Sequence, residues 1–197
     1  MTVLLSSAYF GPVQWYQKLN RFDKVLIENH DSFIKQTYRN RCVIATPNGA
    51  LSLSVPVKPG GGISDHGNWR HVHWNALKSA YGESPFFEYY ADDILPFFKD
   101  RFCSLYDFNM AICRKMCELL DIEPNILFTD HYITAEEAKD SGIVDLRDTI
   151  RPKHPLPDPD FNPKPYYQVY AMRHGFLPNM SILDLLFNMG NESVLWL

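Results

Sequence analysis

Cysteine is scarce in this chain of 197 residues, which contains only four. They form no Cys-x-x-Cys pair and no closely spaced framework, so we interpret them as reduced thiols of a cytoplasmic protein. Cys113 and Cys117 stand four residues apart on a predicted helix and could share a metal ion. Two buried small side chains fit that pattern better, and we predict no metal site.

Long apolar runs are also absent. No stretch approaches the roughly 18 residues needed to cross a bilayer, and the first residues lack the basic start of a secretory signal, so no membrane span is predicted. The chain has no surplus of basic residues either, because its formal net charge is −4. This balance argues against a nucleic-acid partner.

Glycine is sparse, with ten residues, and the chain contains neither a P-loop nor a dinucleotide-binding glycine fingerprint. The Gly-x-Ser-x-Gly motif of serine hydrolases is missing as well. The sequence therefore indicates no particular cofactor. Its 46% hydrophobic, 14% aromatic and 21% charged residues are typical of a globular protein, and we expect one domain spanning residues 1–197.

The N-terminal region predicts a strand, a helix and a second strand. A short apolar run from Val3 to Ser7 is followed by Gly11-Pro12, where proline suits the first turn of a helix. A second apolar run then covers Val25–Glu28. Because two strands joined by a helix usually lie parallel, this region predicts a βαβ unit.

A β-hairpin and a cluster of helices are predicted in the middle of the chain. Residues 41–46 and 50–57 flank Pro47-Asn48-Gly49, and Asn-Gly supplies the positive φ angles of a tight turn. After a glycine-rich loop, apolar spacing and proline positions predict three helices, at about 69–82, at 84–102 with a break at Pro96, and at 107–120.

The last third of the chain predicts fewer regular elements. They are a strand at 125–129, a surface connection with six prolines at about 152–165, an edge strand at 166–172 and a helix from Ser181 to about Gly190. Together the elements predict an α/β fold, with mixed α+β as the alternative, in which an N-terminal βαβ unit and a β-hairpin precede a cluster of helices.

The densest polar segment, Glu28–Arg41, follows the second predicted strand. Open α/β sheets bind ligands at the carboxyl ends of their strands, and the cations of this segment could hold a phosphate or carboxylate there. The predicted substrate-binding residues of the segment are Lys35, Tyr38, Arg39, Asn40 and Arg41. His30, beside Asp31, is predicted as a catalytic acid or base near neutral pH. A solvated loop between two strands is the competing interpretation.

A second polar segment, Asp65–Trp74, contains three histidines. A metal site is disfavoured, because His71 and His73 are two residues apart and face different sides of a helix. His73 shares an apolar stripe with Trp69 and Tyr81, so we predict a catalytic His73 with the two aromatic rings packing on a substrate. The alternative is a core histidine with its own hydrogen-bond partners.

Gly11 adds a weaker signal. It follows the first predicted strand and precedes a helix, whose first backbone N–H groups can attract an anion. Since only one glycine is present at this point, the motif alone does not define a phosphate site. We include Gly11 among the predicted substrate-binding residues because the neighbouring strand leads into the polar segment.

Over nearly its whole length the sequence resembles the WbqC-like proteins. The segments that carry this resemblance are Tyr9–Gln14, Glu28–His30, Tyr38–Arg41, Leu53–Val57, His73-Trp74, Ala80-Tyr81, Ser84–Phe87, Asp107–Asn109, Tyr167–Tyr170, Gly175-Phe176 and Leu183–Asn188. The family takes its name from a member found in an O-antigen gene cluster. The resemblance therefore implies a role in surface-polysaccharide biosynthesis, and it transfers no catalytic residue.

Two hypotheses for function follow. The first is a transferase that acts on an activated sugar or another anionic small molecule, such as a nucleotide sugar, with an amino sugar among the acceptors. The second is a non-catalytic module that binds a carbohydrate or a partner within a biosynthetic assembly. A deep pocket that joins His30, Arg41 and His73 would favour the enzyme, whereas side chains that point to different faces of the fold would remove the physical basis of that hypothesis.

Overall fold

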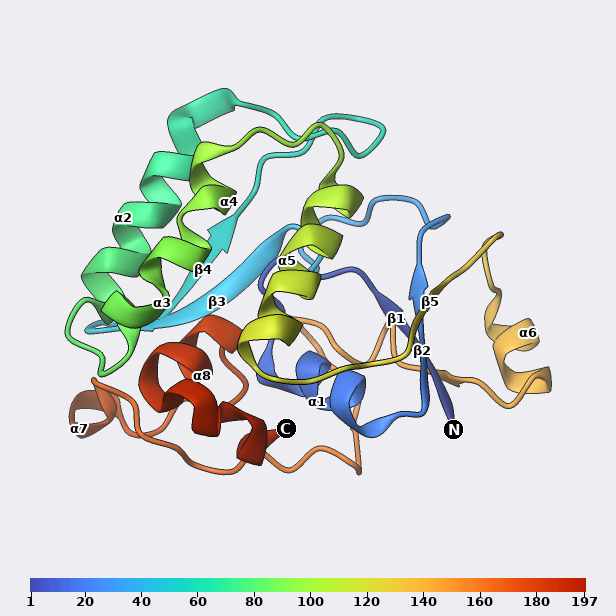
Figure 1. Ribbon diagram of the computed structural model, residues 1–197. Helices are drawn as coiled ribbons and strands as arrows, with labels where there is room; N and C mark the ends of the chain where they lie inside the picture. The colour runs from blue at the N-terminus through green and yellow to red at the C-terminus, as the bar shows by residue number, and fades with distance from the viewer.

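Four parallel strands form one sheet in the order β5-β2-β1-β6 in the computed structural model, which describes residues 1–197 (Figure 1). The strands are β1 (Thr2–Ser6), β2 (Lys24–Glu28), β5 (Ile126–Phe128) and β6 (Val144–Asp145). The predicted βαβ unit is confirmed, because β1 and β2 pair in parallel with Val3 opposite Val25 and are joined by α1 (Val13–Arg21).

The sheet is covered on both faces, which explains the unbroken apolar run of β1. Val3 and Leu5 belong to the main hydrophobic core, whereas Leu4 between them packs with Ile133 and Ala138. Successive side chains of a strand point to opposite faces, so two separate layers bury this strand. Figure 1 shows α1 and α5 (Leu105–Leu119) on one side of the sheet and α6 (Ala135–Asp140) on the other.

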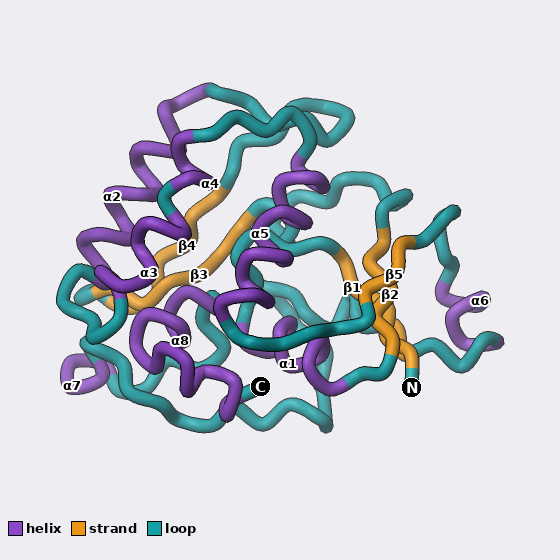
Figure 2. The backbone as a smooth tube through the Cα atoms, in the orientation of Figure 1, coloured by secondary structure: helices purple, strands orange, loops and turns teal.

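The predicted hairpin is confirmed as an antiparallel pair, β3 (Arg41–Thr46) and β4 (Gly49–Ser54). Its turn differs from the expected one, because only Gly49 adopts a positive φ, of 98°, and Asn48 does not. In Figure 2 the strands are confined to this hairpin and the parallel sheet. The two sets of strands therefore occupy separate parts of the molecule.

The predicted helices between the hairpin and the last third are present with shifted bounds. They are α2 (Trp69–Tyr81), preceded by the 3-10 turn η1 (His66–Asn68), then α3 (Phe87–Ile94), α4 (Pro96–Lys99) and α5. The break at Pro96 is confirmed, since proline suits the first turn of α4 and lacks the N–H that would continue α3. Helix α2 packs against β3.

The C-terminal region contains α7 (Ala171–His174), α8 (Ile182–Met189) and the 3-10 segment η2 (Gly190–Trp196). The predicted edge strand at 166–172 is wrong. Tyr166 and Gln168 both turn their side chains inward to hydrogen bond with Asp184, and the segment pairs with no strand. The predicted helix after Ser181 is confirmed, and its N-cap hydroxyl accepts from the Leu183 amide at 3.3 Å.

The proline-rich connection at 152–165 contains no helix or strand. It is nevertheless anchored, because Asp158 forms a buried ion pair with Lys18 of α1 at 2.8 Å. Gln14 donates a second hydrogen bond to the same carboxylate, also at 2.8 Å. None of the helices in the structure has both the length and the apolar character that crossing a bilayer demands.

Candidate functional site at the carboxyl edge of the sheet

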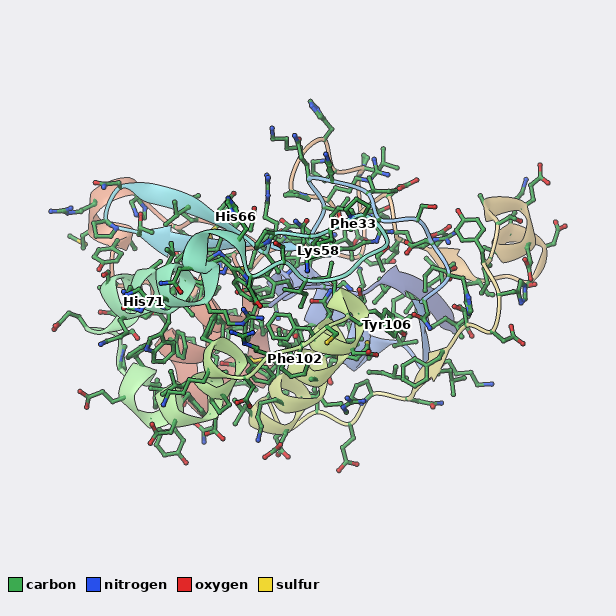
Figure 3. The ribbon with its side chains drawn as sticks, turned by 90° about the horizontal axis from the view of Figure 1, so that it is seen from above. Phe33, Lys58, His66, His71, Phe102 and Tyr106 are labelled. Carbon is green, nitrogen blue, oxygen red and sulfur yellow. The ribbon has the colours of Figure 1, made fainter.

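The carboxyl ends of the parallel strands meet at one edge of the sheet, where a cavity of about 630 Å³ opens. Its walls come from three segments that are distant in sequence: the loop after β2, the loop Val57–Gly61 and the start of α5. Figure 3 shows one side chain from each of them, Phe33, Lys58 and Tyr106, gathered in the same part of the molecule.

The strand order explains why the cavity lies beside β2. The chain passes from β1 outward to β2 and β5, and then crosses to β6 on the other side of β1. Such a reversal between β1 and β6 is where open α/β sheets commonly bind ligands. Here Tyr38 and Arg39 line that crevice and leave only about 10 Å³. The open space is therefore displaced toward the loop that follows β2.

The glycine-rich loop is tied to the start of α5. The Leu105 amide donates to the Gly61 carbonyl at 3.1 Å, and the Ile63 amide donates to the Cys103 carbonyl at 2.9 Å. Gly60 and Gly61 adopt φ angles of 86° and 82°, which suit glycine in particular. These contacts hold Lys58 at the rim of the cavity.

The charges around the cavity favour an anion. Arg39 is buried and forms an ion pair with Asp31, which neutralises the only carboxylate of the lining. Lys35 and Lys58 also line the cavity with exposed side chains, and neither forms an ion pair, although Lys58 lies near enough to Asp65 to help lower the pKa of that carboxyl. Two unpaired lysines therefore give this surface a positive potential that a phosphate or carboxylate would neutralise.

Helix α5 points its N-terminus at the same space. Ser104 caps the helix by accepting from the Asp107 amide at 3.2 Å, and the Leu105 amide donates to Gly61. Most of the first amides of α5 are therefore bonded within the protein, and Asp107 adds a negative charge to the first turn, so the helix end contributes little to the field of the lysines. The Tyr106 hydroxyl is buried without a hydrogen-bond partner. Burial raises the pKa of Tyr106 to about 12, with a further contribution from Asp107. The phenol is thus a neutral donor at neutral pH.

Behind the cavity, a buried carboxylate fixes the ends of the strands. Glu28 accepts hydrogen bonds from the His30 amide at 2.8 Å, from the Thr129 hydroxyl at 3.0 Å and from the Ile133 amide at 3.1 Å. The guanidinium of Arg147 donates to it at 3.1 Å. Every polar atom of this carboxylate therefore has partners, which indicates a rigid support rather than a reacting group.

His30 lies at the end of β2, in a second hollow of about 400 Å³. Its Nε2 is 2.9 Å from the carbonyl oxygen of Thr129, which can only accept, so Nε2 must carry the proton. In the neutral imidazole this leaves Nδ1 as an acceptor. His30 thus has the tautomer of a general base, and it shares its hollow with Asp31 and Arg39.

The other predicted residues of the polar segment divide into three groups. Lys35 and Arg39 line the cavity. Tyr38 lines the closed crevice and a neighbouring hollow. Asn40 donates to the Val55 carbonyl at 2.9 Å, and Arg41 donates to the Ser54 hydroxyl at 3.2 Å. These last two side chains therefore serve the hairpin in this structure.

His73 lies in the core, where its Nδ1 accepts from the Tyr9 hydroxyl at 2.8 Å and the Trp69 ring packs at 5.1 Å. Burial lowers the pKa of His73 to about 4, although an interaction with the Ser54 backbone opposes this shift. The hollow that contains His30 includes neither His73 nor Arg41. The structure does not bring the three together, and our proposal for the site does not include His73.

Trp69 and Tyr81 are buried as well. The Trp69 indole donates to the Ser64 carbonyl at 2.9 Å, and the Tyr81 hydroxyl donates to Asp184 at 2.8 Å. Both rings take part in core packing, away from the sheet-edge cavity. Neither ring is therefore placed where it could stack on a substrate in the sheet-edge cavity.

Gly11 has a structural reason to be glycine. A Cβ added there would lie 2.8 Å from the Cβ of Ala8. The first amides of α1 are already bonded, because the Val13 amide donates to the Met180 carbonyl at 3.0 Å and the Gln14 amide donates to the Asn179 side chain at 2.9 Å. The predicted anion site at this helix start is therefore filled by the protein itself.

Two features of the cavity were not predicted from the sequence. Lys58 and Tyr106 belong to segments that meet the polar loop only in three dimensions, and no local pattern marks them. Ser32 and Lys35 have the Ser-x-x-Lys spacing of some hydrolases, and both line the cavity. Their segment is not helical, so this spacing does not place them on one face as it does in a helix.

A second basic hollow, of about 430 Å³, lies between α2 and α4. It contains Arg70 and Arg101, both of which form ion pairs with Asp65. Figure 3 shows His71 of this hollow on α2, away from Phe33 and Tyr106. The two arginines share this one carboxylate, and Lys99 also lines the hollow, which is therefore cationic as well. It is the weaker candidate because it lies away from the carboxyl ends of the strands, where open α/β sheets commonly bind ligands.

The fold and this geometry define an α/β protein with a cationic cavity at the carboxyl edge of a parallel sheet. The chain belongs to the WbqC-like protein family, whose model matches residues 7–156. The matched span includes every residue that lines the cavity. "Uncharacterized protein Rv1507c" of Mycobacterium tuberculosis is 24% identical over 220 residues, which cover 97% of this chain and 95% of that protein. No solved structure matches the chain.

Proposed function

We propose that this WbqC-like protein is a cytoplasmic transferase that binds a phosphate-bearing donor, such as an activated sugar, in the sheet-edge cavity. The observation that carries the proposal is the pair of unpaired lysines, Lys35 and Lys58, facing one cavity beside the buried Arg39. The family resemblance supports surface-polysaccharide biosynthesis, including that of O-antigen, as the setting.

We assign a separate role in such a transfer to each of these residues. Lys35 and Lys58 hold the phosphate of the donor and stabilise the negative charge that grows on the leaving group. His30 accepts the proton of the incoming nucleophile through Nδ1. The network around Glu28 keeps the backbone of His30 and the Thr129 loop in place.

Ligand-dependent unfolding tests the binding half of the proposal. We would measure thermal unfolding with inorganic phosphate, pyrophosphate, UDP, UDP-glucose and acetyl phosphate. A ligand at a large excess over its dissociation constant should stabilise the protein by about 2–4 kcal/mol. Replacing both lysines, Lys35→Gln with Lys58→Gln, should remove the stabilisation. The matched control is Lys78→Gln with Lys139→Gln, two exposed lysines on α2 and α6, which should leave it unchanged.

Release of the leaving group separates the two candidate functions. With a donor that binds and an acceptor sugar present, either glucosamine or a methyl glycoside, the wild type should release UDP or phosphate, and His30→Gln should slow that release by about a hundredfold or more at unchanged donor affinity. Donor binding without any release would favour the non-catalytic carbohydrate- or partner-binding module. No stabilisation by any of these anions, or equal loss in the control pair, would contradict the anion site.

A further inference from the structure

The sheet-edge cavity adjoins the hollow that contains His30. The two spaces, of about 630 and 400 Å³, share the lining residues Asp31, Ser32 and Arg39. The ion pair between Asp31 and Arg39 thus forms part of the boundary between them. A molecule in one space would lie directly beside a molecule in the other.

The charges of the second space differ from those of the first. Three arginines line it, and each forms an ion pair with a carboxylate of the same lining. The pairs are Arg39–Asp31, Arg147–Asp145 and Arg151–Asp148. Because the charges cancel, a net anion or a net cation gains little here, in contrast to the cavity with two unpaired lysines.

The polar groups of the second space are held in fixed positions. Arg147 is anchored at all three nitrogens, by Asp145 at 2.6 and 3.0 Å, by Glu28 at 3.1 Å and by the Ile133 carbonyl at 2.8 Å. Its guanidinium lies 5.1 Å from the centre of the Tyr132 ring, which is 48% exposed. The lining therefore presents hydrogen-bond donors and acceptors in fixed positions beside an aromatic ring.

Two groups of this lining lack a partner for their remaining atoms. The Nε of Arg151 is buried and has no hydrogen-bond partner in the protein. His30 uses Nε2 on the Thr129 carbonyl, which leaves Nδ1 available. His30 is therefore the residue of this lining with an available ring nitrogen, while the Arg151 guanidinium, which also borders a neighbouring hollow, keeps an unused donor.

We infer that the second hollow is a subsite for a neutral, hydroxyl-rich ring, that is, a sugar. Hydroxyl groups both donate and accept, so they match alternating carboxylates and guanidinium groups, and the face of a sugar ring can pack on Tyr132. The inference rests on the proposed function, in which this sugar is the acceptor. Its hydroxyl gives a proton to Nδ1 of His30 and its oxygen bonds to the transferred group, while the donor's phosphate leaves with the electron pair of the broken bond.

Saturation-transfer and ¹⁵N chemical-shift NMR with neutral methyl glycosides test the subsite. The probes are methyl α-D-glucopyranoside, methyl β-D-galactopyranoside and methyl α-D-mannopyranoside. At least one should bind saturably and shift the amides of His30, Tyr132 and Arg151. Tyr132→Ala should weaken that binding by about fivefold or more, and Tyr132→Phe should keep it. Tyr89→Ala removes a tyrosine that is 75% exposed on α3 and should have no effect.

The same samples titrated with pyrophosphate distinguish this inference from the proposed function. Pyrophosphate binding without saturable glycoside binding, or with glycoside shifts outside the hollow, overturns the sugar subsite and leaves the anion site standing. Glycoside binding in the hollow without pyrophosphate binding rejects the anion site alone. An equal loss in Tyr89→Ala and Tyr132→Ala, or binding of glucosamine but of none of the neutral glycosides, also overturns the inference.

Discussion

Two polar clusters in this protein contrast in how their charges are satisfied. Asp184 on α8 is buried and accepts from the Tyr81 hydroxyl at 2.8 Å, the Tyr166 hydroxyl at 2.6 Å and the Gln168 amide at 2.7 Å. At the sheet edge, by contrast, Lys35 and Lys58 face a cavity without carboxylate partners. The first cluster is complete within the protein, whereas the second leaves two exposed ammonium groups, which we propose a ligand neutralises.

The contrast separates structural polar residues from functional ones. A buried polar group must be hydrogen bonded, and the partners of Asp184 come from α2 and the segment before α7, while the Tyr81 hydroxyl in turn accepts from the Ala45 amide of β3. Such a network joins elements of the fold and leaves no space for a ligand. Charges that stay unpaired beside a cavity bring no comparable stability, which agrees with the binding role that we propose for them. The predictions below are ordered by their expected effect on stability.

The largest loss should come from Asp184→Ala. The substitution leaves two tyrosine hydroxyls and one amide buried without their acceptor, so we expect the free energy of unfolding to fall by about 4 kcal/mol. Urea unfolding measures this directly, and Asp184→Asn should cost less because it keeps one acceptor. If Asp184→Ala unfolds like the wild type but no longer binds pyrophosphate, Asp184 serves ligand binding and not the stability of the fold.

The second largest loss of stability should come from Asp158→Ala. It leaves the Lys18 ammonium, whose side chain is 1% exposed, without its carboxylate, and breaking such a buried pair should cost about 3 kcal/mol. Asp160→Ala, in the same connection, is the control, because an exposed side chain should change stability by no more than about 0.5 kcal/mol. Equal urea midpoints for the two variants would show that the ion pair does not anchor the proline-rich connection.

His73 gives the fold an acid sensitivity that a residue at the open cavity would lack. Its pKa of about 4 in the folded protein lies below its ordinary value of 6.5, because burial disfavours the charged imidazole. The unfolded state therefore binds more protons in this range, and stability must decrease as the pH falls. Between pH 7.5 and pH 5 the His73 contribution should be a loss of about 2 kcal/mol.

Urea unfolding at several pH values, for the wild type and His73→Gln, measures this contribution. The glutamine variant should show a flatter dependence on pH over this range. Parallel curves for the two proteins would mean that His73 is not the buried neutral imidazole of this structure.

The smallest effect on stability should come from Lys35→Gln and Lys58→Gln. Neither lysine forms an ion pair, so each substitution should change the free energy of unfolding by less than about 0.5 kcal/mol. The affinity for pyrophosphate should nevertheless fall by about tenfold for each, most clearly at low salt, where charges are least screened. Calorimetric titration at two ionic strengths measures it. A stability loss as large as the loss in binding would make these lysines structural.

Much of the fold follows from local sequence patterns. The apolar runs of β1 and β2, the hairpin around Pro-Asn-Gly and the spacing in α2 each depend on neighbours in the chain. The two strands, the hairpin and the helix are confirmed, although the hairpin turn is not of the expected type. Strand β6 was not predicted, because its two residues are too few to show a periodicity. Helix α6 was missed although Thr134 and Glu137 have capping-box spacing, and Thr134 does cap it.

The candidate site was only partly predictable. The charged segment after β2 supplied Lys35 and Arg39, because the carboxyl end of a parallel strand is a general place for ligands. Lys58 and Tyr106 join them through the packing of α5 against the glycine-rich loop, which no local pattern reveals. The apolar stripe of α2 could not show whether His73 lines a cleft or the core, since both positions require the same spacing.

The position of a bound anion would show directly whether the sheet-edge cavity is an anion-binding site. A crystal structure of the protein with pyrophosphate should show phosphate oxygens within hydrogen-bonding distance of the Lys35 and Lys58 ammonium groups, at the start of α5. Pyrophosphate bound instead only to Arg70 and Arg101 beside α2, with no density in the sheet-edge cavity, would show that this cavity is not the anion-binding site.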